Sequence, residues 1–252
     1  MTPTIKEYSS ISRAIKACKD HLVVAGTTHQ GNSWQSTTPL DKMVEVLGIS
    51  FRAPVPSNIN ELVIQCQPNL PWADEHFLER VSGKPLNPPP SHVRWPFGVR
   101  ANAKHVKDEQ FSHTYPERIW PKHVAHKHLS LHGIRYEYGD LDDVINLLKD
   151  QKHTRKAFLP IWFPEDTGPL GGQRVPCTLG YLFQVKNGRM DITYYIRSCD
   201  VIRHFRDDIY MAVRLLYHVM GRVGKRLRPG HINMHIANLH CFQGDFEVYD
   251  NY

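Results

Sequence analysis

Apolar residues recur every three or four positions in three segments of the chain, and this spacing predicts amphipathic helices. The clearest segment is residues 141–150, where Asp140 supplies an N-cap and the apolar side chains share one face. Residues 208–220 show the same period over a longer stretch, and residues 73–81 over a shorter one. We therefore expect three helices at these places.

Other segments are continuously apolar or alternate apolar with polar residues, which is typical of strands. A hairpin is predicted at Asn187-Gly188, because this dipeptide suits a two-residue turn and apolar stretches flank it. The predicted strands are residues 43–51, 157–163, 178–185, 190–196 and 232–238. Helices and strands do not alternate regularly, so the pattern predicts the α+β class, with a mixed or antiparallel sheet packed against helices.

Two stretches predict irregular structure. Residues 84–91 contain four prolines, which remove amide donors and fix the backbone. Residues 91–138 are rich in histidine and aromatic residues and predict only loops and short elements.

Length and composition indicate a single domain over residues 1–252. The chain is 41% hydrophobic and 22% charged, which excludes disordered and collagen-like proteins. No stretch approaches about 18 consecutive apolar residues, and the N-terminus lacks the apolar segment of a signal peptide. We expect a cytoplasmic protein with no membrane partner. Five cysteines without a CxxC pair predict free thiols in a reducing compartment.

Charge favours an anionic ligand. The chain has 31 Lys and Arg against 25 Asp and Glu, a net charge of +6 and a pI near 9.0. The basic residues are scattered, so charge alone does not predict nucleic-acid binding. The sixteen histidines include two groups, residues 123–128 and 231–240. Positions i and i+4 of a strand lie too far apart to bind one ion, so we expect no metal site.

A lone cysteine is usually a buried structural residue, and Cys177 after Pro176 indicates no function by itself. Three motifs follow it in order: Arg197-Ser198-Cys199-Asp200-Val201, then Asp208 eleven positions after the arginine, then His240 two positions before Phe242. Together these motifs resemble the thymidylate synthase superfamily. Residues 140–156 and 44–51 are similar to further parts of that family, so the resemblance covers most of the chain.

The resemblance implies a thymidylate-synthase-like fold in which Cys177 acts as a thiolate that adds to C6 of a pyrimidine nucleotide. It assigns the 5′-phosphate to Arg197 and Ser198, and the phosphate held by a partner subunit to Arg155 and Lys156. Arginine suits phosphate because its planar guanidinium donates two parallel hydrogen bonds. The resemblance also implies a homodimer that pairs through one face of the sheet and shares its active sites.

Asp208 is the position most informative about the base. Thymidylate synthases have an asparagine there, which accepts from N3–H of uracil and donates to O4. A carboxyl group suits cytosine, because it can accept from the 4-amino group while a proton is shared with N3. Thr178 and the segment Phe205-Arg206-Asp207-Asp208 also resemble bacteriophage deoxycytidylate hydroxymethylases. The implied reaction transfers a hydroxymethyl group from the co-substrate 5,10-methylenetetrahydrofolate to C5 of dCMP.

The same resemblance suggests further site residues. The family's general acid/base is a glutamate on an early helix, which makes Glu75 the candidate and Glu79, four positions on, the reserve. Tyr115 would lie near the nucleophile, and Asp200 and Trp95 would contact the folate. His240 would hold the sugar hydroxyl.

Departures from the family pattern leave alternatives open. Phe242 stands where a tyrosine helps to bind the sugar, and Lys156 replaces an arginine. The chain also ends at Tyr252, soon after His240, so we expect an unusual folate pocket. The alternatives are hydroxymethylation of CMP or dUMP, C5 methylation of dCMP or dUMP as in a thymidylate synthase, and an inactive relative that binds nucleotides or nucleic acid. The resemblance implies a bacteriophage protein working in its host's cytoplasm.

Overall fold

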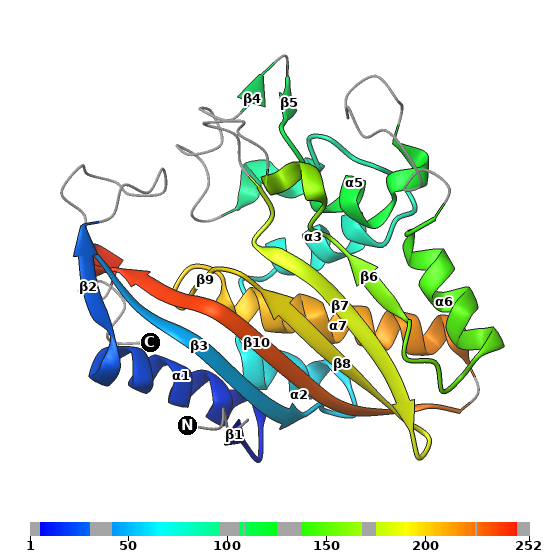
Figure 1. Ribbon diagram of the computed structural model, residues 1–252, viewed down its shortest axis with the longest axis horizontal. Coiled ribbons are helices and arrows are strands. Elements are labelled where there is room, and N and C mark those ends of the chain that lie inside the picture. Colours follow the sequence, from blue (N-terminus) through cyan, green and yellow to red (C-terminus); the bar gives the residue numbers. More distant parts are fainter. Residues whose placement is uncertain are drawn as a thin grey trace.

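The computed structural model describes residues 6–30, 42–95, 106–107, 109–124, 138–167, 175–224 and 226–245. An eight-stranded sheet forms its centre (Figure 1). Six strands follow the order β1-β3-β10-β8-β7-β6, while β2 pairs with β3 and β9 with β10. The strands are β1 (Lys6–Glu7), β2 (Thr27–Gln30), β3 (Lys42–Pro54), β6 (Phe158–Pro160), β7 (Thr178–Lys186), β8 (Arg189–Ile196), β9 (Cys199–Asp200) and β10 (Arg228–Phe242).

The sheet is mixed, with β10 at its middle. β10 pairs antiparallel with β3 and parallel with β8, and β8 pairs antiparallel with β7. The register sets Met234 beside Phe51 on one side and Tyr194 on the other, and all three side chains are buried. One apolar row therefore crosses the sheet on its helix-covered face. A second, short sheet joins β4 (Val106–Lys107) to β5 (Gln110–Phe111).

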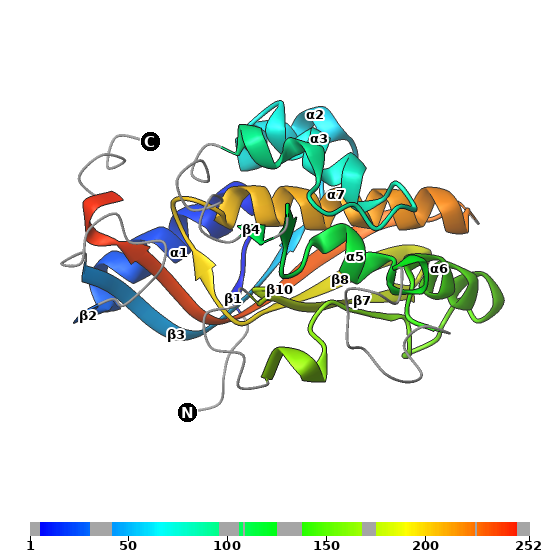
Figure 2. The same ribbon diagram turned by 90° about the horizontal axis from the view of Figure 1, so that it is seen from above.

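Helices cover this apolar face. The longest, α7 (Phe205–Val223), lies along the sheet, and two helices stack beyond it, α2 (Ile59–Cys66) and α3 (Trp72–Arg80) (Figure 2). The remaining helices are α1 (Ile11–Ala25), α5 (Tyr115–Ile119) and α6 (Leu141–Asp150), with 3-10 turns η1 (Pro90–Arg94), η2 (Pro121–His123) and η4 (Pro164–Thr167). Among the described residues, no helix is long and apolar enough to cross a membrane.

The opposite face of the sheet carries a polar network. The hydroxyl of Ser50 lies 2.9 Å from Nδ1 of His235, whose ring stacks on Tyr195 at 5.2 Å. Arg52 lies 3.0 Å from Nδ1 of His231. This face is therefore much more polar than the face that α7 covers.

Most of the predicted elements are confirmed. Residues 141–150 form α6, with a capping box between Asp140 and Asp143. The hairpin turns at Asn187 and Gly188, whose φ angles of 51° and 72° are those of a left-handed two-residue turn. The described parts of residues 84–138 contain only irregular chain and short elements, as expected.

The structure differs from the sequence predictions in one strand and in several elements that were not predicted. The predicted strand 157–163 is too long, because β6 ends at Pro160, which has no amide to continue the ladder. The amides of Ile161 and Trp162 both donate instead to the carbonyl of Leu179. The short strands β1, β2 and β9 and the helices α1 and α2 were not predicted. Ser10 caps α1 and Asn58 caps α2, and the buried residues of both helices follow helical spacing.

Candidate active site

The site forms where the ends of β7 and β8 meet. Cys177 precedes β7 and is partly buried, whereas the other four cysteines are buried. Arg197 follows β8 and donates to the carbonyl oxygens of Pro176 and Val175 at 2.9 and 3.2 Å. One of its terminal nitrogens lies 4.0 Å from Sγ of Cys177. The sequence-predicted nucleophile and phosphate ligand are thus neighbours, and the arginine also fixes the turn that carries the cysteine.

A group of hydroxyls lies beside Cys177. The buried hydroxyl of Thr178 lies 3.2 Å from that of Tyr115 and 2.9 Å from that of Tyr194. The ring of Tyr181 stacks on Tyr194 at 4.7 Å. Burial raises the pKa of Tyr115 and Tyr194, so both phenols stay protonated at neutral pH. Tyr115 therefore contacts the first residue of the strand that follows Cys177.

Asp208 lies in the first turn of α7, partly buried. Within the described chain, its carboxyl group has one hydrogen-bond partner, the thiol of Cys199, which donates to Oδ2 at 3.6 Å. Burial raises the pKa of Asp208 to about 7, and the positive charge of Arg80 opposes this rise. The adjacent Asp207 belongs to the fold instead, because Asn69 donates to both of its oxygens at 2.8 and 2.7 Å.

We predict that Asp208→Asn stabilises the protein increasingly as pH rises. An aspartate titrates ordinarily at 3.8, so between about pH 4 and pH 7 the folded protein retains a proton that the unfolded chain has released. The free energy of unfolding of the wild type therefore falls across this window. The asparagine does not titrate, so the variant lacks the part of this fall that is due to Asp208. Between pH 4.5 and pH 8, the variant's free energy of unfolding should gain about 1–3 kcal/mol relative to the wild type. Urea unfolding at both pH values measures this, and a pH-independent difference would contradict it.

A second polar pair lies where β9 meets β10. The hydroxyl of Ser198 lies 3.4 Å from Nδ1 of His240, and β10 sets His240 directly beside Asp200. Burial lowers the pKa of His240 to about 4, so its ring is neutral at pH 7. The ring meets Phe242 edge to face at 5.9 Å.

Asp200 is completely buried at the end of β9, where the turn that leads to α7 begins. Its Oδ1 accepts from the amides of Ile202 and Arg203, both at 2.9 Å. Oδ2 has no hydrogen-bond partner among the described residues and lies 3.8 Å from Nε of Arg203. Burial raises the pKa of this carboxyl to about 6. One oxygen thus serves the turn, and the other remains able to accept a hydrogen bond.

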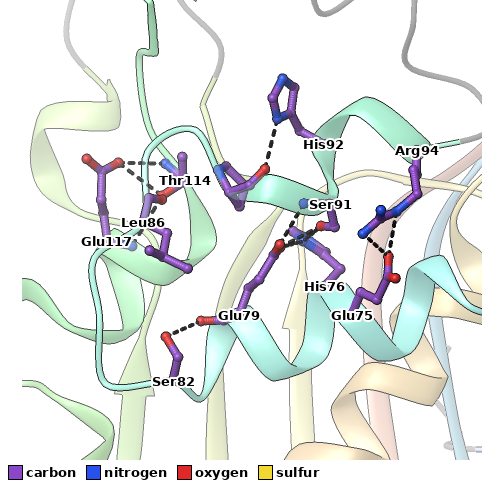
Figure 3. Close-up of polar contacts among 11 residues, drawn as sticks. Glu75, His76, Glu79, Ser82, Leu86, Ser91, His92, Arg94, Thr114 and Glu117 are labelled. Carbon is purple, nitrogen blue, oxygen red and sulfur yellow. Dashed lines mark hydrogen bonds and ion pairs between the residues drawn. The ribbon is translucent and has the colours of Figure 1, made fainter.

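The two glutamates of α3 have different surroundings (Figure 3). Glu75 is 35% exposed and pairs with Arg94 at 2.6 Å. Glu79 is largely buried and accepts from the amide and hydroxyl of Ser91 at 2.6 and 2.5 Å. Nδ1 of His76 lies 3.3 Å from the same carboxylate. Burial raises the pKa of Glu79, but these hydrogen bonds outweigh it and leave the pKa below its ordinary value.

Sequence reasoning missed the row of α3 that contacts Tyr115. His76 stacks on Trp72 at 5.1 Å and meets Tyr115 edge to face at 6.5 Å. The guanidinium of Arg80 lies 4.0 Å from the centre of the Tyr115 ring. Burial, reinforced by the charge of Arg80, lowers the pKa of His76 to about 4. Trp72, His76 and Arg80 follow one another at intervals of four positions, a spacing that places them on one face of the helix and could have identified them from the sequence.

The other predicted residues lie around this centre. Trp95 is buried and stacks on His204 at 4.9 Å, beside the start of α7. Arg155 and Lys156 are exposed in the segment between α6 and β6. Among the described residues of a single chain, neither Arg155 nor Lys156 contacts Cys177.

The histidines are not gathered into a metal site in the described chain. His231, His235 and His240 bind three different partners: Arg52, Ser50 and Ser198. Of the first histidine group, residues 125–128 lie outside the described residues. Asp200, Cys241 and Asp245 do approach one another closely enough to bind an ion. Arg203 already pairs with Asp245 at 2.6 Å and supplies the positive charge at that place.

The chain is similar in sequence to proteins of one known family. A model of the family described as thymidylate synthase matches residues 104–251. A putative thymidylate synthase of Methanothermobacter thermautotrophicus is 29% identical over 126 residues, which is 46% of this chain and 54% of that protein. The thymidylate synthase of Enterobacteria phage T4 is 26% identical over 114 residues, covering 44% and 38% of the two chains. The chain thus spans about half the length, or less, of these relatives.

A solved structure is similar over nearly the whole chain. The thermostable thymidylate synthase A from Bacillus subtilis superposes with a TM-score of 0.68 at 15% identity, covering 95% of this chain and 82% of that one. This likeness confirms the predicted α+β fold of thymidylate-synthase type.

Proposed function

The chain belongs to the thymidylate synthase family, and from that premise we propose that it transfers a hydroxymethyl group from 5,10-methylenetetrahydrofolate to C5 of dCMP. The observation that carries the choice of base is the carboxyl group of Asp208, at the position where the family has an asparagine. A pKa near 7 suits a group that accepts from an amine and shares a proton with a ring nitrogen.

Cys177 is the proposed nucleophile. Its thiolate adds to C6, and the electron pair of the C5–C6 double bond makes C5 nucleophilic. The cationic Arg197, 4.0 Å from the sulfur, supports this role because a nearby positive charge favours a thiolate. The same arginine and Ser198 are the proposed ligands of the 5′-phosphate. The neutral His240 is the proposed ligand of the sugar hydroxyl.

Glu79 is the better candidate for general acid/base. Its carboxylate is buried and hydrogen-bonded to His76 and Ser91, so protons can pass along a connected chain of groups. Glu75 is engaged at the surface with Arg94, which weakens the case for it.

The folate co-substrate, when bound, supplies the one-carbon unit. Asp200 and Trp95 are the residues proposed to hold it. The buried Oδ2 of Asp200 suits an N–H donor, since it has no hydrogen-bond partner in the described part of the chain. Trp95 adds a large apolar surface next to the start of α7. The reaction as proposed uses no metal ion.

The protein is proposed to work as a homodimer in the cytoplasm of a cell that a bacteriophage infects. Arg155 and Lys156 are exposed, as residues that reach a partner's phosphate must be. The polar face of the sheet, with Arg52, His231 and His235, is the proposed dimer interface.

The test is release of tritium from C5-tritiated dCMP, CMP and dUMP in the presence of methylenetetrahydrofolate, with the mass of the product measured in parallel. Release from dCMP with a hydroxymethyl product supports the proposal. A methyl product would support cytosine as the base but show that the reaction is a methylation. Release of tritium from dUMP alone would exclude cytosine as the base.

A thymidylate synthase acting on dUMP is the second candidate. It is favoured by the names of the curated relatives, which are thymidylate synthases or putative ones. A relative that binds nucleotides without catalysis would bind dCMP or dUMP and release no tritium from any of the three.

A further inference from the structure

His76 lies in the middle of α3 and is connected by contacts to the nucleophile's strand. Its ring stacks on Trp72 at 5.1 Å and meets Tyr115 edge to face at 6.5 Å. The hydroxyl of Tyr115 lies 3.2 Å from that of Thr178, the residue that follows Cys177. On this side, one tyrosine therefore separates His76 from the strand that the cysteine precedes.

The other side of His76 leads to the residues proposed to meet the folate and the base. The ring centres of Trp72 and Trp95 lie 6.3 Å apart, and Trp95 stacks on His204 at 4.9 Å. The amide of Asp208 donates to the carbonyl oxygen of His204 at 2.8 Å. His76 thus lies between the group of residues near the cysteine and the group proposed to hold the co-substrate and the base.

The hydrogen bonds around His76 decide which of its nitrogens carries the hydrogen atom (Figure 3). The hydroxyl of Ser91 donates its single proton to Oε2 of Glu79 at 2.5 Å. Nδ1 of His76 lies 3.1 Å from the Ser91 oxygen and 3.3 Å from the same Glu79 oxygen. Both oxygens are acceptors toward Nδ1, so Nδ1 must be the donor. Burial lowers the pKa of His76 to about 4, so the ring is neutral at pH 7 and Nε2 carries a lone pair.

Nε2 is the basic atom that this arrangement leaves unused. It makes no hydrogen bond to any residue in the described part of the chain, and the His76 side chain keeps 12% of its surface exposed. A neutral imidazole that donates through Nδ1 to a carboxylate is well suited to take up a proton at Nε2, because the carboxylate stabilises the resulting cation. The ionised Glu79 provides this carboxylate.

We propose that His76 is the base for the water that attacks the one-carbon unit on C5, with Glu79 and Ser91 as its positioning residues. This inference rests on the proposed function, in which a methylene group is doubly bonded to C5 once the folate has left. Glu79 acts in this step through His76.

The proposed step balances as follows from the chemistry of an addition and an elimination. The water oxygen bonds to the methylene carbon, and the water proton goes to Nε2 of His76. The electron pair of the exocyclic double bond moves into the ring and then expels the thiolate of Cys177 from C6. The C5–C6 double bond is restored, the hydroxymethyl nucleotide is released, and the imidazolium gives its proton to solvent.

The test compares two readouts of one reaction of the whole protein with methylenetetrahydrofolate: tritium released from C5-tritiated dCMP, and hydroxymethyl-dCMP formed. Tritium leaves C5 before water attacks, so the two readouts separate the steps. In His76→Asn, the amide nitrogen takes the place of Nδ1 and keeps the donor to Glu79, but nothing replaces Nε2. We expect about one equivalent of tritium per site to be released at the wild-type rate, while formation of hydroxymethyl-dCMP slows by about 100-fold or more. His76→Gln also lacks the base and should behave alike, so it tests the inference if His76→Asn fails to fold.

His92→Asn is the matched control. It changes a histidine of the neighbouring turn whose Nδ1 lies 2.8 Å from the carbonyl oxygen of Pro89, and it should leave the ratio of product to released tritium unchanged. Equal slowing of tritium release and product formation by both His76 variants would assign His76 a structural role and overturn the inference, as would unchanged product formation. A wild-type protein that releases no tritium from dCMP, or that forms a methyl product, would overturn the proposed function itself.

Discussion

Cys177→Ser should abolish release of tritium from C5 of the nucleotide while leaving nucleotide binding intact. A serine hydroxyl fills the same space, but it does not ionise near neutral pH and cannot add to C6. We expect the rate of release to fall by more than about 1,000-fold, as it does when a covalent nucleophile is removed from other enzymes. The rate of tritium release and the dissociation constant for dCMP, measured on the same preparation, check this expectation.

Cys18→Ala is the control for this substitution. Cys18 lies on the buried face of α1, so its loss should cost some stability and leave tritium release near the wild-type rate. Iodoacetamide adds a second check, because Cys177 is the cysteine that is not buried. It should be alkylated first in the folded protein, and more slowly when dCMP is bound. Retention of tritium release by Cys177→Ser would show that another group is the nucleophile.

Asp208→Asn should change the preferred base from cytosine to uracil. The amide donates where the carboxylate accepts, so it leaves the 4-amino group of cytosine facing a donor and offers O4 of uracil a partner. Sites that leave a buried polar group unpaired discriminate strongly. We expect the ratio of kcat/KM for dCMP to that for dUMP to fall by at least about 100-fold. Competition between the two nucleotides in one reaction measures the ratio directly.

The neighbouring carboxyl group provides the control. Asp207→Asn replaces one of the two oxygens that accept from Asn69 by a donor, and it should lower the stability of the connection between α2 and α3. It should not alter the ratio for the two bases. A ratio that shifts equally in both variants would mean that charge near the start of α7, and not the contact of Asp208, selects the base.

Local signals explain what could be predicted from the sequence. The helix at 141–150 has its cap and its apolar spacing within one short segment, and the hairpin at Asn187-Gly188 depends on two residues with left-handed backbone. The proximity of Cys177 and Arg197 could be expected because β7 and β8 are consecutive strands of that hairpin. Helix α1 has equally local signals, because Ser10 caps it and its buried residues follow helical spacing.

The rest depends on packing between distant segments. Two contacts decide which glutamate of α3 is buried. Ser91 donates hydrogen bonds to Glu79, and Arg94 forms an ion pair with Glu75 near the surface. Neither contact can be deduced from the helical period, because the two glutamates lie on nearly the same face.

The pairing of β3 with β10 has a consequence for synthesis of the protein. Paired residues such as Pro54 and His231, or Met43 and Phe242, lie about 180 to 200 positions apart in the chain. At about 5–20 residues per second, the ribosome needs about 10 to 40 s after making β3 to deliver its partner. Throughout that interval the nascent chain carries a long strand with an unpaired edge and the apolar side chains of Ile49 and Phe51 uncovered. Such a strand is a site for chaperones, or for aggregation on crowded polysomes.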